Sequence, residues 1–217
     1  MNKQAINKVL RVVSCLIIIG FMYCSYSNSQ SKEAVRNEKV NWEKIKKTYN
    51  GFLECPSSEN ATTFGESLPL TRNVAVTRET SEILRYIFEF ESFALLKREI
   101  WAGNSPAVGA AFRLCNITDA GYSETLWSVL GDLVRINPLL FLEALDAPEN
   151  LLIFDSGRYP VTARGVGYDE RKSAAIYEMR MRVKALEGVK EVKHERTKAA
   201  CIMQLKKEIE NLSQVGA

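Results

Sequence analysis

Two arginines and two tyrosines, Arg158, Tyr159, Arg164 and Tyr168, are the side chains best suited to hold a ligand. They lie in residues 155–169, a stretch with three glycines and a proline between two helical patterns. A planar guanidinium forks onto a carboxylate or phosphate, tyrosine rings stack on ligands, and glycines let backbone N–H groups approach them. The sequence therefore predicts a ligand or partner site in this loop, with an exposed interdomain linker as the alternative.

The usual signatures of nucleotide, metal and acyl-transfer chemistry are missing from the sequence. The P-loop pattern and the Gly-x-Ser-x-Gly elbow do not occur, and the glycines at 165 and 167 lack the strand and third glycine of a dinucleotide fingerprint. Cys-x-x-Cys and His-x-x-x-His spacings are also absent, so we expect no metal and no cofactor. The single histidine, His194, stands among charged residues between two helical patterns and is predicted to be a solvated surface residue.

Acidic residues give no clear general acid or base. Glu79 and Glu82 are explained by a helix N-terminus, where the helix dipole favours negative charge. Glu89 and Glu91 flank one phenylalanine on a helix and point to different sides. Asp132, between two leucines, is the candidate for a buried acid.

The first 31 residues have the layout of a secretory signal peptide. Three basic residues precede an apolar run at 12–23, and small polar residues follow it. We expect residues 1–29 to be removed, by cleavage after Ser27 or Ser29, and residues 30–40 to form a flexible linker. The alternatives are a retained anchor through residues 9–26 and acylation of a cysteine.

Charge excludes a general affinity for nucleic acid in the mature protein. The leader takes three of the 29 basic residues and none of the 26 acidic ones, which leaves nearly equal numbers. Acidic residues prevail in residues 32–150 and basic residues in 170–217. Such a basic tail docks on the acidic body, binds an acidic partner, or has no consequence.

Three cysteines follow the predicted leader. An odd number in an oxidising compartment means one disulfide and a free thiol, or no disulfide. Cys55 and Cys115 are the predicted disulfide pair, and Cys201 is predicted to be a buried thiol in a helix.

Hydrophobic periodicity predicts an all-α fold. We expect a helical domain over residues 41–154, as an irregular helical bundle or a short α-solenoid-like stack, the loop 155–169, and a C-terminal antiparallel helical hairpin over 170–217. Residues 55–72, rich in Ser, Thr, Pro and Gly, are predicted to form a long loop. The expected helices cover residues 41–53, 77–101, 105–114, 118–134, 138–145, 170–186 and 196–212.

Two helix starts, Ser105-Pro106 and Asn137-Pro138, each follow a polar corner. With the apolar pattern between them, residues 105–145 resemble HEAT-type helical hairpins. The resemblance implies a protein that binds other proteins through a concave face and transfers no catalytic residues.

These observations favour a non-enzymatic, exported protein of the cell envelope, periplasmic or secreted, that binds another protein as an inhibitor, immunity protein or structural component. The alternative is an envelope hydrolase acting on cell-wall material. It would use a buried carboxylate such as Asp132 or Glu91, with Arg158 and Arg164 as the anion clamp.

Overall fold

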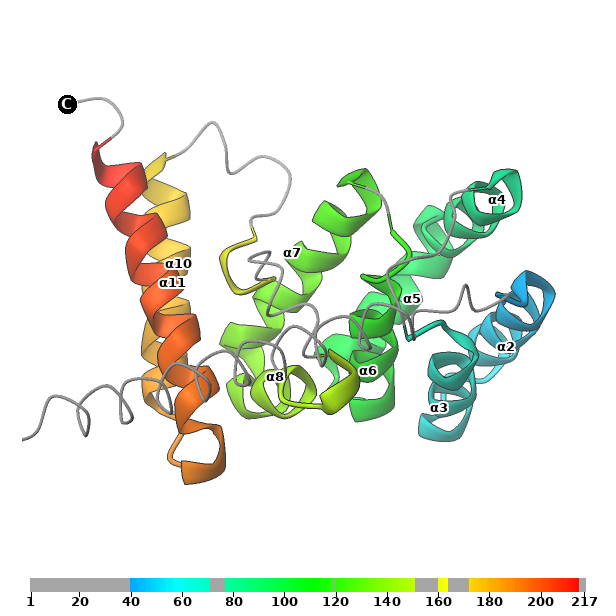
Figure 1. Ribbon diagram of the computed structural model, residues 1–217, viewed down its shortest axis with the longest axis horizontal. Helices are drawn as coiled ribbons and strands as arrows, with labels where there is room; N and C mark the ends of the chain where they lie inside the picture. The colour runs from blue at the N-terminus through cyan, green and yellow to red at the C-terminus, as the bar shows by residue number, and fades with distance from the viewer. Residues whose placement is uncertain (1–39, 71–76, 119, 151–159, 164–171, 215–217) are drawn as a thin grey trace, which may run out of the picture. The chain divides into compact units, whose positions relative to one another are not determined.

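The computed structural model describes residues 40–70, 77–118, 120–150, 160–163 and 172–214 of the 217-residue chain. Within these ranges the fold is all-α, with nine α-helices and no strands (Figure 1). The prediction of the fold class is therefore confirmed. The α-helices are α2 (Trp42–Glu54), α3 (Ser58–Ser67), α4 (Arg78–Ile87), α5 (Phe90–Trp101), α6 (Ser105–Leu114), α7 (Ala120–Ile136), α8 (Pro138–Leu145), α10 (Lys172–Glu187) and α11 (Glu195–Gln214), with short 3-10 turns η1 (Pro148–Asn150), η2 (Pro160–Thr162) and η3 (Val192–His194).

Side-chain caps fix the starts of most of these helices. Asn41 accepts a hydrogen bond from the backbone N–H of Lys44 at 2.9 Å, and Thr77 and Thr80 form a reciprocal capping box. Asn137 caps α8, whose first residue is a proline, as the sequence predicted. At α6 the cap is Asn104 and not Ser105, which is the first helical residue.

The predicted long loop over residues 55–72 is wrong, because most of it is the helix α3. Ser57 caps this helix, and its buried face consists of Ala61, Phe64 and Gly65. The Ser- and Thr-rich composition concealed a helix that packing on α6 stabilises more than its own propensity does.

The single helix predicted over residues 77–101 is also wrong, because the chain leaves the helical conformation at Glu89 (φ −58°, ψ 141°) and starts α5. At this corner the ring of Phe88 stacks on Phe93 and on Tyr122, with centroid distances of 4.9 and 4.7 Å. The aromatic stack stabilises the break between two consecutive helices, which hydrophobic periodicity alone did not reveal.

The core centres on α6, which is buried nearly all round. It contacts α3, α5, α7 and α8. At the α3 contact Gly65 faces Ala110, where an added methyl group would lie 3.5 Å from the Ala110 Cβ. Small residues thus bring the two helices close together, and the rings of Tyr49, Phe52 and Phe64 fill the space between α2 and α3.

The predicted C-terminal hairpin is confirmed: α10 and α11 lie side by side (Figure 1). Helix α10 also contacts α7 and α8, and α11 contacts η2 and α8. The hairpin therefore packs on the body through its inner faces, and the opposite sides of both helices face solvent.

Candidate functional site

The four predicted binding residues, Arg158, Tyr159, Arg164 and Tyr168, lie outside the described residues. Their role as a ligand or partner site stays a prediction. Between them, however, Pro160–Thr162 is described as the turn η2, and its Pro160 and Val161 are buried.

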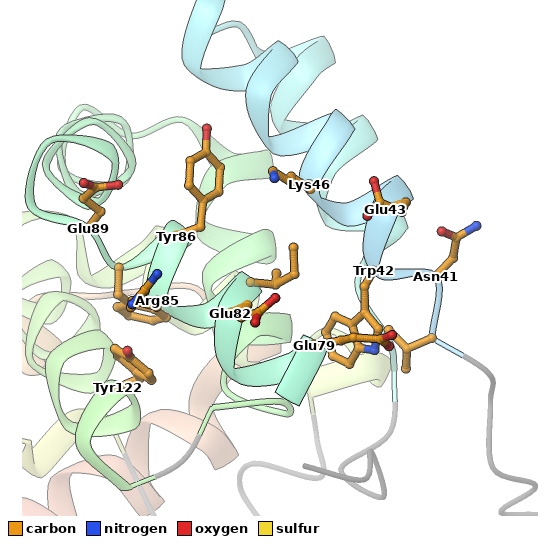
Figure 2. Close-up of a pocket in the computed structure, with 13 residues that line it drawn as sticks. Asn41, Trp42, Glu43, Lys46, Glu79, Glu82, Arg85, Tyr86, Glu89 and Tyr122 are labelled. Carbon is orange, nitrogen blue, oxygen red and sulfur yellow. The ribbon is translucent and has the colours of Figure 1, made fainter. Parts of the chain in front are cut away.

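A cavity of about 1020 Å³ opens between α2, α4 and the start of α7. Figure 2 shows Trp42 and Glu43 from α2 on one side and Glu79, Glu82 and Tyr86 from α4 on the other. The positions on α4 recur at spacings of three and four, so one broad face of that helix lines the cavity. The lining residues are Val40, Asn41, Trp42, Glu43, Lys46, Glu79, Glu82, Ile83, Arg85, Tyr86, Phe88, Glu89 and Tyr122.

Hydrogen bonds hold the two sides of this cavity in place. The hydroxyl of Tyr86 donates to Oδ1 of Asn50 on α2 at 2.6 Å. The hydroxyl of Tyr49 lies within hydrogen-bond distance of the carbonyl oxygens of Ile87 (3.2 Å) and Ser92 (3.0 Å). Burial, with a smaller contribution from Tyr86, raises the pKa of Tyr49 well above its ordinary value, so this hydroxyl stays a hydrogen-bond donor. The cavity is therefore a stable feature of the α2–α4 contact.

The carboxylates of the cavity are exposed to solvent. Glu43, Glu79, Glu82 and Glu89 are all exposed, and Glu82 pairs with Arg78 at 2.8 Å. A general acid needs an apolar pocket that raises its pKa, and exposed side chains lack such surroundings. The cavity is thus suited to binding, through polar rim groups and partly buried aromatic rings, more than to acid–base catalysis.

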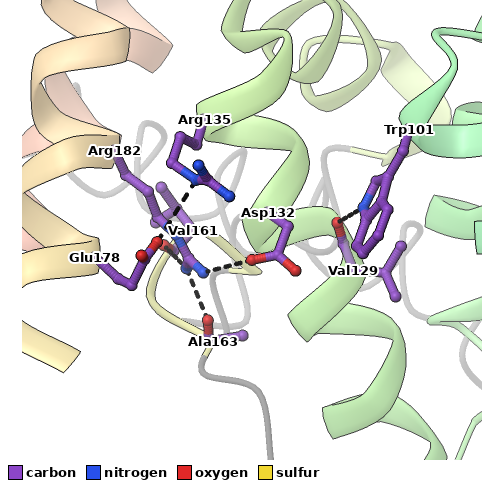
Figure 3. Close-up of polar contacts among 8 residues, drawn as sticks. All are labelled: Trp101, Val129, Asp132, Arg135, Val161, Ala163, Glu178 and Arg182. Atoms are coloured by element: carbon purple, nitrogen blue, oxygen red, sulfur yellow. Dashed lines mark hydrogen bonds and ion pairs between the residues drawn. The ribbon is translucent and has the colours of Figure 1, made fainter. Parts of the chain in front are cut away.

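A second polar cluster lies between α7, α10 and η2, around the guanidinium of Arg182 (Figure 3). Arg182 is only 3% exposed. It donates to the carbonyl oxygens of Val161 (2.9 Å) and Ala163 (2.7 Å) and lies 3.5 Å from Oδ1 of Asp132. Arg182 therefore anchors the described turn in the middle of the predicted recognition loop.

Asp132 was the candidate buried acid, and the structure shows it partly buried, with 30% of its side chain exposed. Burial raises the pKa of the Asp132 carboxyl, against the lowering effects of Arg182 and Arg135. Nearby, Arg135 pairs with Glu178 at 3.6 Å. The carboxylate of Asp132 already has the guanidinium of Arg182 as its partner within the fold. Asp132 is therefore explained as part of the contact through which Arg182 holds the turn η2.

The prediction that His194 is a solvated surface residue is wrong. His194 is 5% exposed, and its Nδ1 contacts the carboxylate of Asp146, which also accepts a hydrogen bond from Thr197. The charged residues next to it in the chain face solvent, but Asp146, which caps the end of α8, lies 48 residues earlier. This contact joins the hairpin to the body. The local sequence pattern could not reveal it, because the two residues are far apart in the chain.

The three cysteines differ in exposure. Cys201 is fully buried, as predicted, and burial, with a smaller contribution from Asp146, raises its pKa to about 12, so the thiol is protonated. Cys55 is exposed and Cys115 is buried, and no disulfide joins these two residues, both of which the structure describes. Their pairing in an oxidising compartment stays a prediction. In the described part of the chain no cluster of His, Cys, Asp or Glu is arranged to hold a metal ion.

Sequence reasoning missed the α2–α4 cavity because its residues come from separate helices. Glu79 and Glu82 were attributed to a helix N-terminus, but only Glu79 lies in the first turn of α4. A position along one helix contains no signal for the pairing of α2 with α4.

Comparison of the chain with family models, with curated proteins and with solved structures gave no match. The class of this protein is therefore defined by its fold alone, as an all-α protein. Helices α7 and α8 do contact each other, but the resemblance of residues 105–145 to HEAT-type hairpins stays a prediction.

Proposed function

We propose that this chain is an exported protein of the cell envelope that acts by binding another protein, and that the α2–α4 cavity receives part of the partner. The observation that carries the proposal is the lining of the cavity. Tyrosine, tryptophan and phenylalanine side chains, which are enriched at protein interfaces, line the cavity, and the exposed charged groups beside them suit the polar rim of such an interface.

The hydrolase alternative has less support. Of its two candidate acids, Asp132 is engaged by Arg182, and Glu91 is exposed at the start of α5. The two arginines proposed as its anion clamp, Arg158 and Arg164, lie outside the described residues. A catalytic pair would need two carboxyls in one enclosed cleft.

The binding proposal is tested by photo-crosslinking from inside the cavity. Arg85 lines the cavity and is exposed, and replacing it with benzoylphenylalanine places the crosslinker there. Thr62, exposed on α3 and outside the cavity, is the matched control position. We expect an adduct with one protein from position 85, absent from position 62 and reduced by Trp42→Ala. Equal adducts from both positions, or none from position 85, would contradict the proposal.

Export rests on the residues 1–29, which lie outside the described ranges. None of the helices in the described part of the chain is long and apolar enough to cross a membrane. We expect the intact mass of the exported protein to correspond to a chain that begins after Ser27 or Ser29. A retained Met1 would favour the anchor through residues 9–26 instead.

A further inference from the structure

The outer sides of α10 and α11 each present an exposed stripe that combines cations with one large apolar side chain. On α10, Tyr177, Arg180 and Lys184 lie opposite the buried residues of that helix, at spacings of three and four. Tyr177 is 61% exposed. Exposed tyrosine beside arginine is typical of a protein-binding surface.

On α11 the stripe contains Arg196, Met203 and Lys207, spaced by seven and four residues, so they lie along one side of the helix. The exposed Glu210, three residues after Lys207, closes this stripe toward the end of the helix. Met203 is 67% exposed, and the buried residues Cys201 and Leu205 point the other way. Both helices therefore expose cations and one large apolar side chain to solvent.

The cations of the two stripes form no ion pair within the part of the chain that the structure describes. Elsewhere the hairpin uses its charges within the fold: Lys193 pairs with Glu143, Lys198 with Glu195, and Lys206 with Glu187. Arg180, Lys184, Arg196 and Lys207 form no ion pair with any residue that the structure describes. With four cations against one acid, Glu210, and two exposed apolar side chains, the two stripes together are complementary to negative charge.

We propose that the exposed stripes of α10 and α11 together form a second docking surface, independent of the α2–α4 cavity, and that it binds an acidic segment of a partner protein. Arginine forks onto carboxylates, and tyrosine and methionine supply the apolar contacts that protein interfaces favour. A membrane surface would require a wider apolar face than one large residue per helix. Nucleic acid would require a larger excess of positive charge than the formal +3 of the whole chain, three units of which lie in its first 31 residues.

The test measures binding of the full mature protein to a labelled 12-residue peptide of alternating Glu and Leu by fluorescence anisotropy at low salt. The same peptide with Gln in place of Glu is the ligand control. We expect binding of the acidic peptide alone, weakened roughly tenfold by Arg180→Glu with Lys184→Glu, and likewise by Arg196→Glu with Lys207→Glu. Lys44→Glu with Lys47→Glu, on the exposed side of α2, is the matched charge control and should change the affinity less than twofold.

Several outcomes would overturn this inference. One is equal weakening by the α2 control, which would show that only net charge matters; another is an effect of one hairpin pair alone, which would exclude a joint surface. Tighter binding to phosphatidylglycerol vesicles or to a single-stranded oligonucleotide would assign the face to a membrane or to nucleic acid. Crosslinking from position 85 reports on the cavity separately, so failure of either proposal leaves the other standing.

Discussion

The contacts α3–α6 and α7–α10 are both buried helix interfaces, yet their chemistry differs. Between α3 and α6 the small residues Gly65 and Ala110 pack closely, and the guanidinium of Arg113 also donates to the carbonyl oxygen of Gly65 at 2.9 Å. Between α7 and α10 the buried guanidinium of Arg182 satisfies two carbonyls and a carboxylate. Apolar packing tolerates small shifts, whereas a buried ion must keep its partners or lose much of its stabilising effect. The contact between α3 and α6 is therefore held mainly by close packing, and the contact of α10 with α7 and η2 is held by directional polar contacts.

The largest expected effect is in the apolar core beside the α3–α6 contact, where α3 also packs on α2. Phe64 is fully buried and its ring centroid lies 4.8 Å from that of Tyr49. Phe64→Ala should lower the free energy of unfolding by about 3–5 kcal/mol, because it leaves a cavity in the core. Urea denaturation measures the loss, and Phe64→Leu provides a milder variant if the alanine form does not fold.

The matched control for this change is Phe90→Ala. Phe90 is 87% exposed at the start of α5. Its removal should change the stability by less than about 0.5 kcal/mol. Similar losses at positions 64 and 90 would contradict the assignment of the core.

The second prediction concerns the polar contact. Arg182→Met keeps much of the side-chain volume but leaves two carbonyls and Asp132 without their donor, and should cost about 2–4 kcal/mol. Arg180→Met, the exposed neighbour on the same helix, should be nearly neutral. If Arg182→Met is neutral as well, the hairpin is held by packing and the contrast between the two interfaces disappears.

The third prediction tests whether the guanidinium of Arg182 is held in place, by adding a methyl group at the neighbouring Gly131. A methyl group at Gly131 would lie 2.6 Å from the nearest guanidinium nitrogen of Arg182, which its carbonyl partners hold in place. Gly131→Ala should therefore cost about 1–3 kcal/mol by displacing that group. In the double variant with Arg182→Met the cost of the added methyl should largely vanish, and the difference in unfolding free energies measures this coupling. Additive losses would contradict a direct contact.

A smaller effect is expected in the pH dependence. The folded-state pKa of Asp132 is raised above the unfolded value by burial, so the folded protein binds a proton at this site more tightly than the unfolded chain. This contribution to stability is present below the unfolded pKa and is lost as the pH rises through the folded pKa. The unfolding free energy of the wild type, relative to that of Asp132→Asn, should therefore fall as the pH rises above about 4. The opposite slope would show that the attraction of Arg182 outweighs burial.

The same contrast explains how much the sequence revealed. Caps such as Asn41, Thr77 and Asn137 act within four residues, so helix starts were predicted well. The burial of Cys201 followed from its apolar neighbours in the helix. Helix α3 was missed because its stability comes from α6, more than 40 residues away, and not from its Ser- and Thr-rich composition.

Polar contacts across the fold were hidden for a related reason. His194 and Asp146 are 48 residues apart, and Arg182 and Asp132 are 50 residues apart. A charged residue in a helical pattern predicts a solvated face in nearly every case, so burial of Arg182 could not be recognised without its partners. The exposed stripes of the hairpin were foreseen only as a basic tail, since their freedom from ion pairs depends on which other cations the fold engages.

The smallest expected effect is the loss of an exposed ion pair of the hairpin, which we compare with the loss of a buried polar contact next to it in the chain. Lys193 pairs with Glu143 at 3.1 Å, but the two side chains are 64% and 44% exposed, so solvent screens their attraction. Lys193→Ala should therefore change the unfolding free energy by less than about 0.5 kcal/mol. His194→Ala, one residue further along the chain, should lower the unfolding free energy by more than about 1 kcal/mol. The reason is that the half-buried carboxylate of Asp146 loses its contact with the imidazole of His194. Urea denaturation of both variants gives the comparison. Equal losses would mean that the exposed pair positions the hairpin as firmly as the buried one, and that burial does not decide which polar contacts hold it.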